Sequence, residues 1–215
     1  MNLSFIGLGV MGYPMAGFLA NAGYQVTVFN RTESKAKKWS QEFKGSYALT
    51  PLEASKNADI IFTCVGNDDD VRQVILGPKG VIHGLKNNAI VVDHTTASSV
   101  LAEELDNYIS DAGGSFIDAP LSGGQAGAES GQLTIMVGGE EAIFTKVSPV
   151  MNNYAKACTL IGGVGSGQKA KMVNQICIAG LVQGLAEGLH FAKREKLNIE
   201  AVINAISKGA AQSWQ

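Results

Sequence analysis

The chain has 215 residues, of which 46% are hydrophobic and 17% charged, a balance typical of a soluble globular protein. Its formal net charge of -2 gives no electrostatic footprint for nucleic acid. Polar residues interrupt every apolar run before it reaches membrane-spanning length, and no signal peptide is visible, so we expect a cytoplasmic protein with no membrane partner.

The first elements form a strand, a glycine-rich turn and a helix. A strand is expected at residues 3–6 and a helix at 13–21. The turn between them reads Gly7-Leu8-Gly9-Val10-Met11-Gly12. In this context the first glycine permits the tight turn, the second lets the backbone approach a pyrophosphate, and the third lets helix and strand pack closely. Unpaired N–H groups at the helix N-terminus favour the phosphates, so this segment predicts dinucleotide binding.

Strand-like and helix-like segments then alternate through the first three quarters of the chain. Strands are expected at 25–29, 59–65, 89–93, 115–119, 133–137 and 157–161, and helices at 34–41, 69–76 and 98–112. Apolar strands joined by helices indicate a parallel sheet covered on both faces. We therefore predict an α/β fold, with a Rossmann domain over residues 1–163 built on a doubly wound, mostly parallel sheet.

The pattern changes after Gly167. Residues 168–196 carry apolar positions at helical spacing with no turn signal, and a further helix is expected at 201–207. These elements predict an all-α domain over 164–215, incomplete in this chain and beginning with a long helix. Gly180, Gly184 and Gly188 lie at four-residue steps, which indicates close approach of another backbone. We expect a homodimer or higher homo-oligomer through this helix. Polar residues interrupt it and argue against a membrane span, namely Gln175, Gln183, Glu187 and His190.

The residues after the second strand bear on the choice of nicotinamide cofactor. In a Rossmann unit a carboxylate there accepts from the adenosine ribose and selects NAD. Here the residues are Asn30, Arg31 and Thr32, followed by Lys35. A guanidinium and a hydroxyl suit a 2′-phosphate, which favours NADP over NAD. The alternative is that Arg31 is an ordinary solvated loop charge.

The ends of the next two strands complete the expected cofactor site. Val65, Gly66 and Asn67 follow one strand, and Thr95 and Thr96 follow the other. Because the carboxyl ends of parallel strands share one edge of the sheet, we expect these residues to contact the cofactor. The alternative for the two threonines is that they cap the following helix.

Cysteine and histidine give no metal signature. The three cysteines, Cys64, Cys158 and Cys177, lie among apolar neighbours and predict buried, reduced thiols. The three histidines, His83, His94 and His190, are scattered without ligand spacing, so we expect no metal.

Two later motifs add to the glycine turn. One is Asp118-Ala119-Pro120-Leu121-Ser122-Gly123-Gly124, and the other is Gly167 with Lys171 and Asn174. With these three motifs the chain resembles the β-hydroxyacid dehydrogenase family, which includes 3-hydroxyisobutyrate dehydrogenase and the tartronate, glyoxylate and succinic semialdehyde reductases. The resemblance extends over the whole available length. Members of this family usually continue with further helices that close the active site, so we expect this chain to be truncated and weakly active or inactive.

The resemblance implies roles for these residues. Lys171 becomes the catalytic acid/base, Ser122, Gly123 and Gly124 hold the substrate carboxylate, and Asn174 orients substrate or lysine. Gln175 is a further substrate-binding candidate, at a position where some relatives have Asn. The chemistry agrees, because hydride transfer to or from a carbonyl needs one group that moves the hydroxyl proton, and a desolvated lysine can do this near neutral pH.

Two functions follow as hypotheses. The first is an NADP-dependent oxidoreductase acting on a small hydroxyacid or aldehyde acid, such as 3-hydroxyisobutyrate, succinic semialdehyde, glyoxylate or tartronate semialdehyde. The second is a non-catalytic dinucleotide-binding module of the same fold. The presence of Lys171 favours the enzyme.

Overall fold

The computed structural model describes residues 1–213, and the chain divides into two compact units, Met1–Lys171 and Met172–Gln215. The division by compactness falls eight residues after the domain boundary that we expect from sequence at 163. That boundary stays a prediction.

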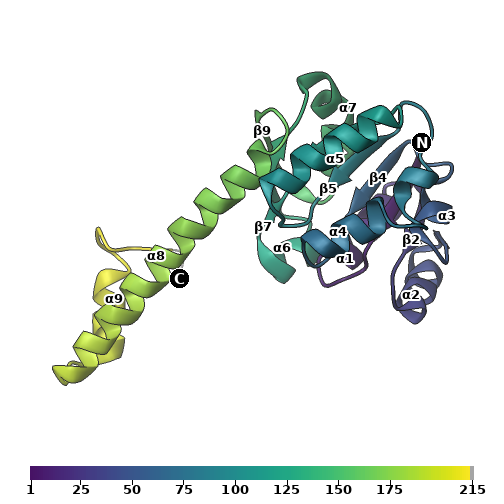
Figure 1. The fold of residues 1–215 in the computed structure, drawn as a ribbon. Coiled ribbons are helices and arrows are strands. Elements are labelled where there is room, and N and C mark those ends of the chain that lie inside the picture. The colour runs from purple at the N-terminus through teal and green to yellow at the C-terminus, as the bar shows by residue number, and fades with distance from the viewer. Residues whose placement is uncertain (214–215) are drawn as a thin grey trace. The chain divides into compact units, whose positions relative to one another are not determined.

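A sheet forms the centre of the first unit (Figure 1). Its strands run in the order β3-β2-β1-β4-β5-β6-β8-β7, with β9 beside β8. The pairs from β3 through to β6 are parallel, β8 is antiparallel to both β6 and β7, and β9 is parallel to β8. The predicted Rossmann fold with a mostly parallel sheet is confirmed. The strands are β1 (Asn2–Ile6), β2 (Gln25–Phe29), β3 (Ser46–Tyr47), β4 (Ile60–Thr63), β5 (Ile90–Asp93), β6 (Ser115–Asp118), β7 (Leu121–Ser122), β8 (Leu133–Gly138) and β9 (Ala155–Gly162).

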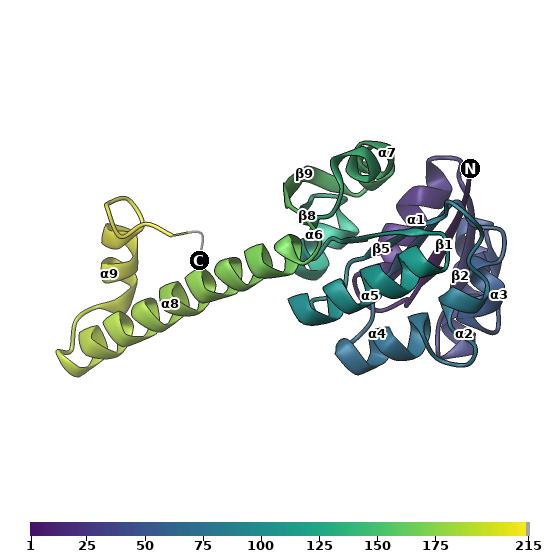
Figure 2. The ribbon, with the colours of Figure 1, turned by 45° about the horizontal axis from the view of Figure 1, so that its top comes forward.

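Helices cover both faces of the sheet. On one face α1, α2 and α7 contribute Met15, Trp39 and Val147 to a core cluster. On the other face α3, α4 and α5 form a second cluster, and α4 and α5 lie side by side in Figures 1 and 2. The helices are α1 (Gly12–Asn21), α2 (Glu33–Phe43), α3 (Pro51–Ser55), α4 (Asp68–Ile75), the 3-10 helix η1 (Val81–His83), α5 (Ser99–Asp111), α6 (Gly124–Glu129) and α7 (Glu141–Met151).

The central strands bury side chains on both faces, which explains their continuous apolar sequences. Phe5 and Phe62 belong to one core cluster, with ring centroids 5.8 Å apart, whereas the adjacent Ile6 and Ile61 belong to the other. Successive side chains of a strand point to opposite faces, so a sheet covered on both sides needs apolar residues at every position.

The longer predicted elements are present, and several short ones were not predicted. Ser98, and neither Thr95 nor Thr96, caps α5, because the Ser98 hydroxyl accepts a hydrogen bond from the Leu101 amide at 3.1 Å. Elements of two to six residues carry too few periodic positions to be recognised. Pro149 lies inside the longer α7 and argues against a helix on sequence grounds. The elements that sequence analysis did not predict are β3, α3, η1, β7, α6 and α7.

The second unit contains most of α8 (Ser166–Arg194) and all of α9 (Ile199–Ile206). Ala192 is the one buried residue among residues 172–213. Cys177 is exposed and Cys64 and Cys158 are half-buried, so the prediction of buried thiols is wrong for Cys177, which lies on a helix face that no described residue covers. By length and composition alone α8 is long and apolar enough to cross a membrane, contrary to the expectation from its polar residues, and none of its most apolar window is buried within the described residues.

Candidate functional site

A groove of about 600 Å³ opens at the carboxyl ends of β1, β2 and β4. This is the edge of a parallel sheet at which α/β proteins bind nucleotides. Ten of the fifteen residues that we expect to contact the cofactor line it, namely Gly7, Gly9, Val10, Met11, Asn30, Arg31, Thr32, Lys35, Val65 and Gly66. Eight further lining residues were not predicted, namely Ile6, Phe29, Pro51, Cys64, Asp70, Gln73, Val74 and Lys79.

The glycine turn has the geometry of a phosphate cradle. Gly7 has a φ of +99°, which only glycine adopts readily, and its amide donates to the Phe29 carbonyl at 2.9 Å. A side chain on Gly12 would collide with the Gly7 carbonyl, so the third glycine packs helix against strand. The space beside Gly9 is open to 4 Å, which leaves room for a pyrophosphate. The turn therefore fits a dinucleotide.

Asn30 supports this turn from the end of β2. Its side-chain oxygen accepts from the Leu8 amide at 2.9 Å, and its side-chain nitrogen donates to the Thr32 carbonyl at 3.1 Å. Leu8 itself is buried and does not line the groove. Asn30 thus holds the backbone of the cradle in place, in addition to lining the groove.

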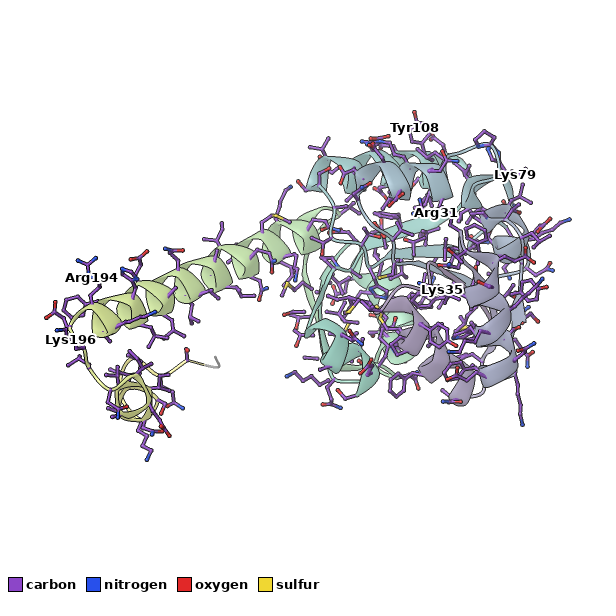
Figure 3. The ribbon with its side chains drawn as sticks, turned by 90° about the horizontal axis from the view of Figure 1, so that it is seen from below. Arg31, Lys35, Lys79, Tyr108, Arg194 and Lys196 are labelled. Carbon is purple, nitrogen blue, oxygen red and sulfur yellow. The ribbon has the colours of Figure 1, made fainter. Side chains whose placement is uncertain are left out.

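Cationic side chains gather at the same groove (Figure 3). The Arg31 guanidinium is 89% exposed and lies 3.4 Å from the Asp70 carboxylate. Thr32 is the N-cap residue of α2, and its hydroxyl makes no capping hydrogen bond. Lys35 lines the groove one turn into α2. A guanidinium, a free hydroxyl and an amine in one groove can bind a phosphate.

The remaining predicted cofactor residues lie beside the groove and not on it. Asn67 caps α4 by accepting from the Asp70 amide at 3.0 Å. Thr95 is buried, and its hydroxyl accepts from the Val65 amide at 3.1 Å, so it positions a residue that does line the groove. Thr96 is exposed.

A buried polar network holds Thr95. Asp93 accepts from the Thr63 hydroxyl at 2.7 Å and from the Thr95 amide at 3.0 Å. Burial raises the pKa of Asp93 to about 6. Gln168, a fully buried residue that sequence analysis missed, donates to the Thr95 carbonyl at 2.7 Å and accepts from the Ala97 amide at 3.0 Å. The Gln168 side chain therefore fastens the start of α8 to the segment after β5.

Lys171 lies one turn further along α8. Its amine is largely buried, with 8% of the residue exposed, and donates to the Leu121 carbonyl at 2.7 Å. Burial lowers the pKa of Lys171 below its usual range. Asp118 anchors the same turn, because its carboxylate accepts from the amides of Gly165 and Gln168 at 2.7 and 2.8 Å. The amine is thus fixed beside the segment that begins with Leu121.

That segment continues into Ser122, Gly123 and Gly124. Ser122 pairs with Thr134 in the β7–β8 ladder, and Gly123 is the N-cap residue of α6 with a φ of +132°. The space beside Gly124 is open to 4 Å. The first N–H groups of a helix have no partner within it, so this turn offers donors near the carbonyl that holds Lys171.

Asn174 and Gln175 belong to the second unit. They follow Lys171 by three and four residues on α8, and the Asn174 side chain donates to that of Gln175 at 3.0 Å. Their roles stay predictions. No cluster of metal-ligating side chains is present in residues 1–213, and Cys64 lines the groove with a pKa that burial raises to about 12.

Two family models match the chain. Residues 2–163 match the NAD-binding domain of 6-phosphogluconate dehydrogenase. Residues 165–215 match a domain described as the NAD-binding domain of NADP-dependent 3-hydroxyisobutyrate dehydrogenase. Together the two matches include the groove, Lys171 and both described helices of the second unit.

Curated relatives and solved structures are similar to this chain over nearly its whole length. An uncharacterized oxidoreductase of Shewanella frigidimarina is 59% identical over all of this chain and 74% of its own length. A probable 3-hydroxyisobutyrate dehydrogenase-like protein of Arabidopsis thaliana, described as mitochondrial, is 42% identical over 99% of this chain and 63% of its own length. The structure of Mycobacterium tuberculosis 3-hydroxyisobutyrate dehydrogenase with L-serine has a TM-score of 0.92 at 28% identity, covering 99% of this chain and 72% of that one.

Proposed function

The chain belongs to the β-hydroxyacid dehydrogenase family, and on that basis we propose that the protein is an NADP-dependent oxidoreductase acting on a short hydroxyacid or the corresponding aldehyde acid. The candidate substrates are 3-hydroxyisobutyrate, succinic semialdehyde, glyoxylate and tartronate semialdehyde. The observation that carries the proposal is the buried Lys171 amine, held beside a glycine-rich turn within the same compact unit as the nucleotide groove.

The groove provides the seat for the cofactor. The open space beside Gly9 accommodates the pyrophosphate, and the N-terminus of α1 supplies amide donors and a favourable dipole. Arg31, Thr32 and Lys35 supply donors for a 2′-phosphate. No carboxylate follows β2 directly to bind a free ribose hydroxyl, which supports NADP over NAD. When bound, the nicotinamide supplies or accepts the hydride.

Lys171 moves the proton. In aldehyde reduction its ammonium donates a proton to the carbonyl oxygen, and in alcohol oxidation its neutral amine accepts the hydroxyl proton. Desolvation disfavours the ammonium and brings the pKa closer to the working range of such a catalyst. The Leu121 carbonyl orients the amine until a substrate oxygen takes over this contact.

The substrate carboxylate fits the turn after Leu121. The donors available there are the amide groups of the exposed Gly123 and Gly124 and the hydroxyl of the half-buried Ser122. A small acid held there by its carboxylate presents its other end to Lys171. Asn174 and Gln175 are further proposed functional residues, Gln175 for binding substrate and Asn174 for orienting the substrate or the lysine.

We further propose a homodimer through the long helix. Several large apolar side chains of α8 are exposed, among them Met172, Val173, Ile176, Val182 and Phe191. Exposed apolar surface of this extent on a helix usually marks an interface, and a second copy of the chain would bury it. The cytoplasmic location expected from sequence stays a prediction.

The deciding experiment follows NADPH absorbance at 340 nm with a panel of short aldehyde acids and the intact protein. We expect oxidation of NADPH that Lys171→Ala slows by about 10²–10⁴-fold, the usual contribution of a positioned acid/base. Lys169→Ala, which removes an exposed amine from the same helix, is the matched control and should retain activity. An NADPH-binding protein that turns over no member of the panel would instead favour the non-catalytic module.

A further inference from the structure

The groove carries a third cation that the sequence analysis did not assign to it, and we infer that this residue, Lys79, binds the 2′-phosphate of the adenosine and so helps to select NADP. The inference rests on the proposed NADP dependence. Lys79 lies in the turn between α4 and η1, whereas the other two cations of the groove, Arg31 and Lys35, come from the end of β2 and the start of α2.

The charge of the groove supports an anionic ligand. Its lining contains three cations, Arg31, Lys35 and Lys79, and one carboxylate, Asp70. Asp70 lies 3.4 Å from Arg31. Within residues 1–213 neither Lys35 nor Lys79 forms an ion pair. The groove therefore carries more positive charge than Asp70 neutralises, although the protein as a whole has a net charge of -2. This excess of cations indicates a binding site for an anion.

The backbone around Lys79 is held in one position. The Gly80 amide donates to the Gly77 carbonyl at 2.7 Å, which closes a tight turn with Pro78 and Lys79 at its centre. The Lys79 carbonyl accepts from the Leu52 amide of α3 at 2.9 Å. The side chain of Lys79 is exposed, whereas Gly80 next to it is buried. The fold therefore fixes the point from which this amine reaches the groove.

The 2′-phosphate is the anion that suits this amine. The pyrophosphate is provided for by the glycine turn and the N-terminus of α1, which carry no basic side chain. Arg31 shares its charge with Asp70, so a phosphate dianion near it is not neutralised by Arg31 alone. A lysine supplies the missing positive charge as a point charge on a flexible stem. A free ribose hydroxyl gains little from the same amine, so the contact discriminates between the two cofactors.

The test measures binding of 2′,5′-ADP and 5′-AMP to the 215-residue chain by calorimetry, because these ligands differ only in the 2′-phosphate. We expect Lys79→Gln to weaken 2′,5′-ADP by about tenfold, the loss of one charge-assisted hydrogen bond, and 5′-AMP by less than about twofold. Lys146→Gln on α7 makes the same charge change at an exposed site outside the groove and should alter neither affinity. Lys79→Arg, which keeps the positive charge, should retain most of the preference for 2′,5′-ADP over 5′-AMP.

The outcomes separate this inference from the proposed function. If the unaltered chain prefers 2′,5′-ADP and Lys79→Gln keeps that preference, Lys79 does not bind the 2′-phosphate, although NADP dependence stands. Equal weakening of both ligands would place Lys79 at the adenine and would also overturn the inference. If the unaltered chain binds both ligands equally, the NADP preference and the role of Lys79 both fail, while dinucleotide binding remains.

Discussion

At the residue scale, His94 illustrates how burial changes a titratable group. Its ring is buried, with Nδ1 2.7 Å from the Ala119 carbonyl and Nε2 2.8 Å from the Tyr154 hydroxyl, and it stacks on Phe62 with ring centroids 5.7 Å apart. Burial lowers the pKa of His94 to about 4. The neutral ring can donate to the carbonyl and accept from the tyrosine, so it joins the segment before Ser122 to the start of β9.

We predict that His94 makes the protein sensitive to acid. The pKa of His94 is about 4 in the folded protein and 6.5 for a free histidine, so the unfolded state binds more protons between these two pH values. Stability from this residue is therefore present above about pH 6.5 and is lost as the pH falls towards 4, by at most about 3 kcal/mol at 1.36 kcal/mol for each pH unit. The free energy of unfolding from urea titrations checks this, comparing the unaltered chain with His94→Gln at each pH.

The comparison with His94→Gln is needed because Asp93 acts in the opposite direction. Burial raises the pKa of Asp93 to about 6, so the folded state takes up its proton first and gains stability as the pH falls below 6. This effect is present in both proteins and cancels in their difference. An advantage of the unaltered chain over His94→Gln that stays constant from pH 7 to pH 4 would contradict the role given to His94.

At the scale of elements, α8 contains three glycines that no close contact within the described part of this chain requires. Within residues 1–213 no atom lies within 4 Å of the positions where side chains on Gly180, Gly184 and Gly188 would begin. Each costs about 1 kcal/mol relative to alanine inside a helix. This cost is understandable if a second backbone packs closely against that face, as the proposed dimer requires.

We predict that Gly184→Leu converts the proposed dimer to a monomer, because a large side chain there keeps two helices apart. Ala186→Leu is the matched control, since it adds a leucine two residues away on the opposite side of the same helix. Light scattering after size-exclusion chromatography measures the mass of each variant. A Gly184→Leu protein that stays dimeric, or an equal effect of both substitutions, would show that the glycine face is not the interface.

At the scale of the whole molecule, the two units differ in what they bury. Residues 1–171 contain two core clusters and the groove, whereas residues 172–213 bury one residue, Ala192. The chain also spans 74% and 63% of the two curated relatives described above. The first unit has the core that an independent domain needs, and the second does not.

We predict that the 215-residue chain binds NADPH but turns over aldehyde acids weakly or not at all. Binding requires the groove, which lies in the first unit with its two core clusters, whereas Asn174 and Gln175, which we propose bind substrate, lie in the second unit, where residues 172–213 bury only Ala192. Fluorescence titration with NADPH and absorbance at 340 nm measure the two properties on one sample. Turnover close to that of intact family members would refute this division of roles.

The sequence was sufficient for those parts of the protein that depend on local chemistry. Gly7 to Gly12 could be predicted because their spacing fits one backbone shape, and the buried strands because their apolar runs are continuous. Arg31, Thr32 and Lys35 could be placed in the groove because they follow β2 directly. Short elements such as β7 and α6 could not be predicted, since too few residues carry their periodicity.

Tertiary structure decided the contacts between residues that are distant in sequence. Gln168 bonds to Thr95 and Ala97 across more than 70 positions, and Asp118 bonds to Gly165 across 47. Lys79 lines the groove from a turn that is hydrogen-bonded to Leu52 of α3, 27 residues away. Residue type and spacing thus determined the fold and the candidate chemistry, because turn geometry and hydrophobic period are local. The partners of each buried polar group depended on the complete fold, because only folding brings the strand ends and helix termini together.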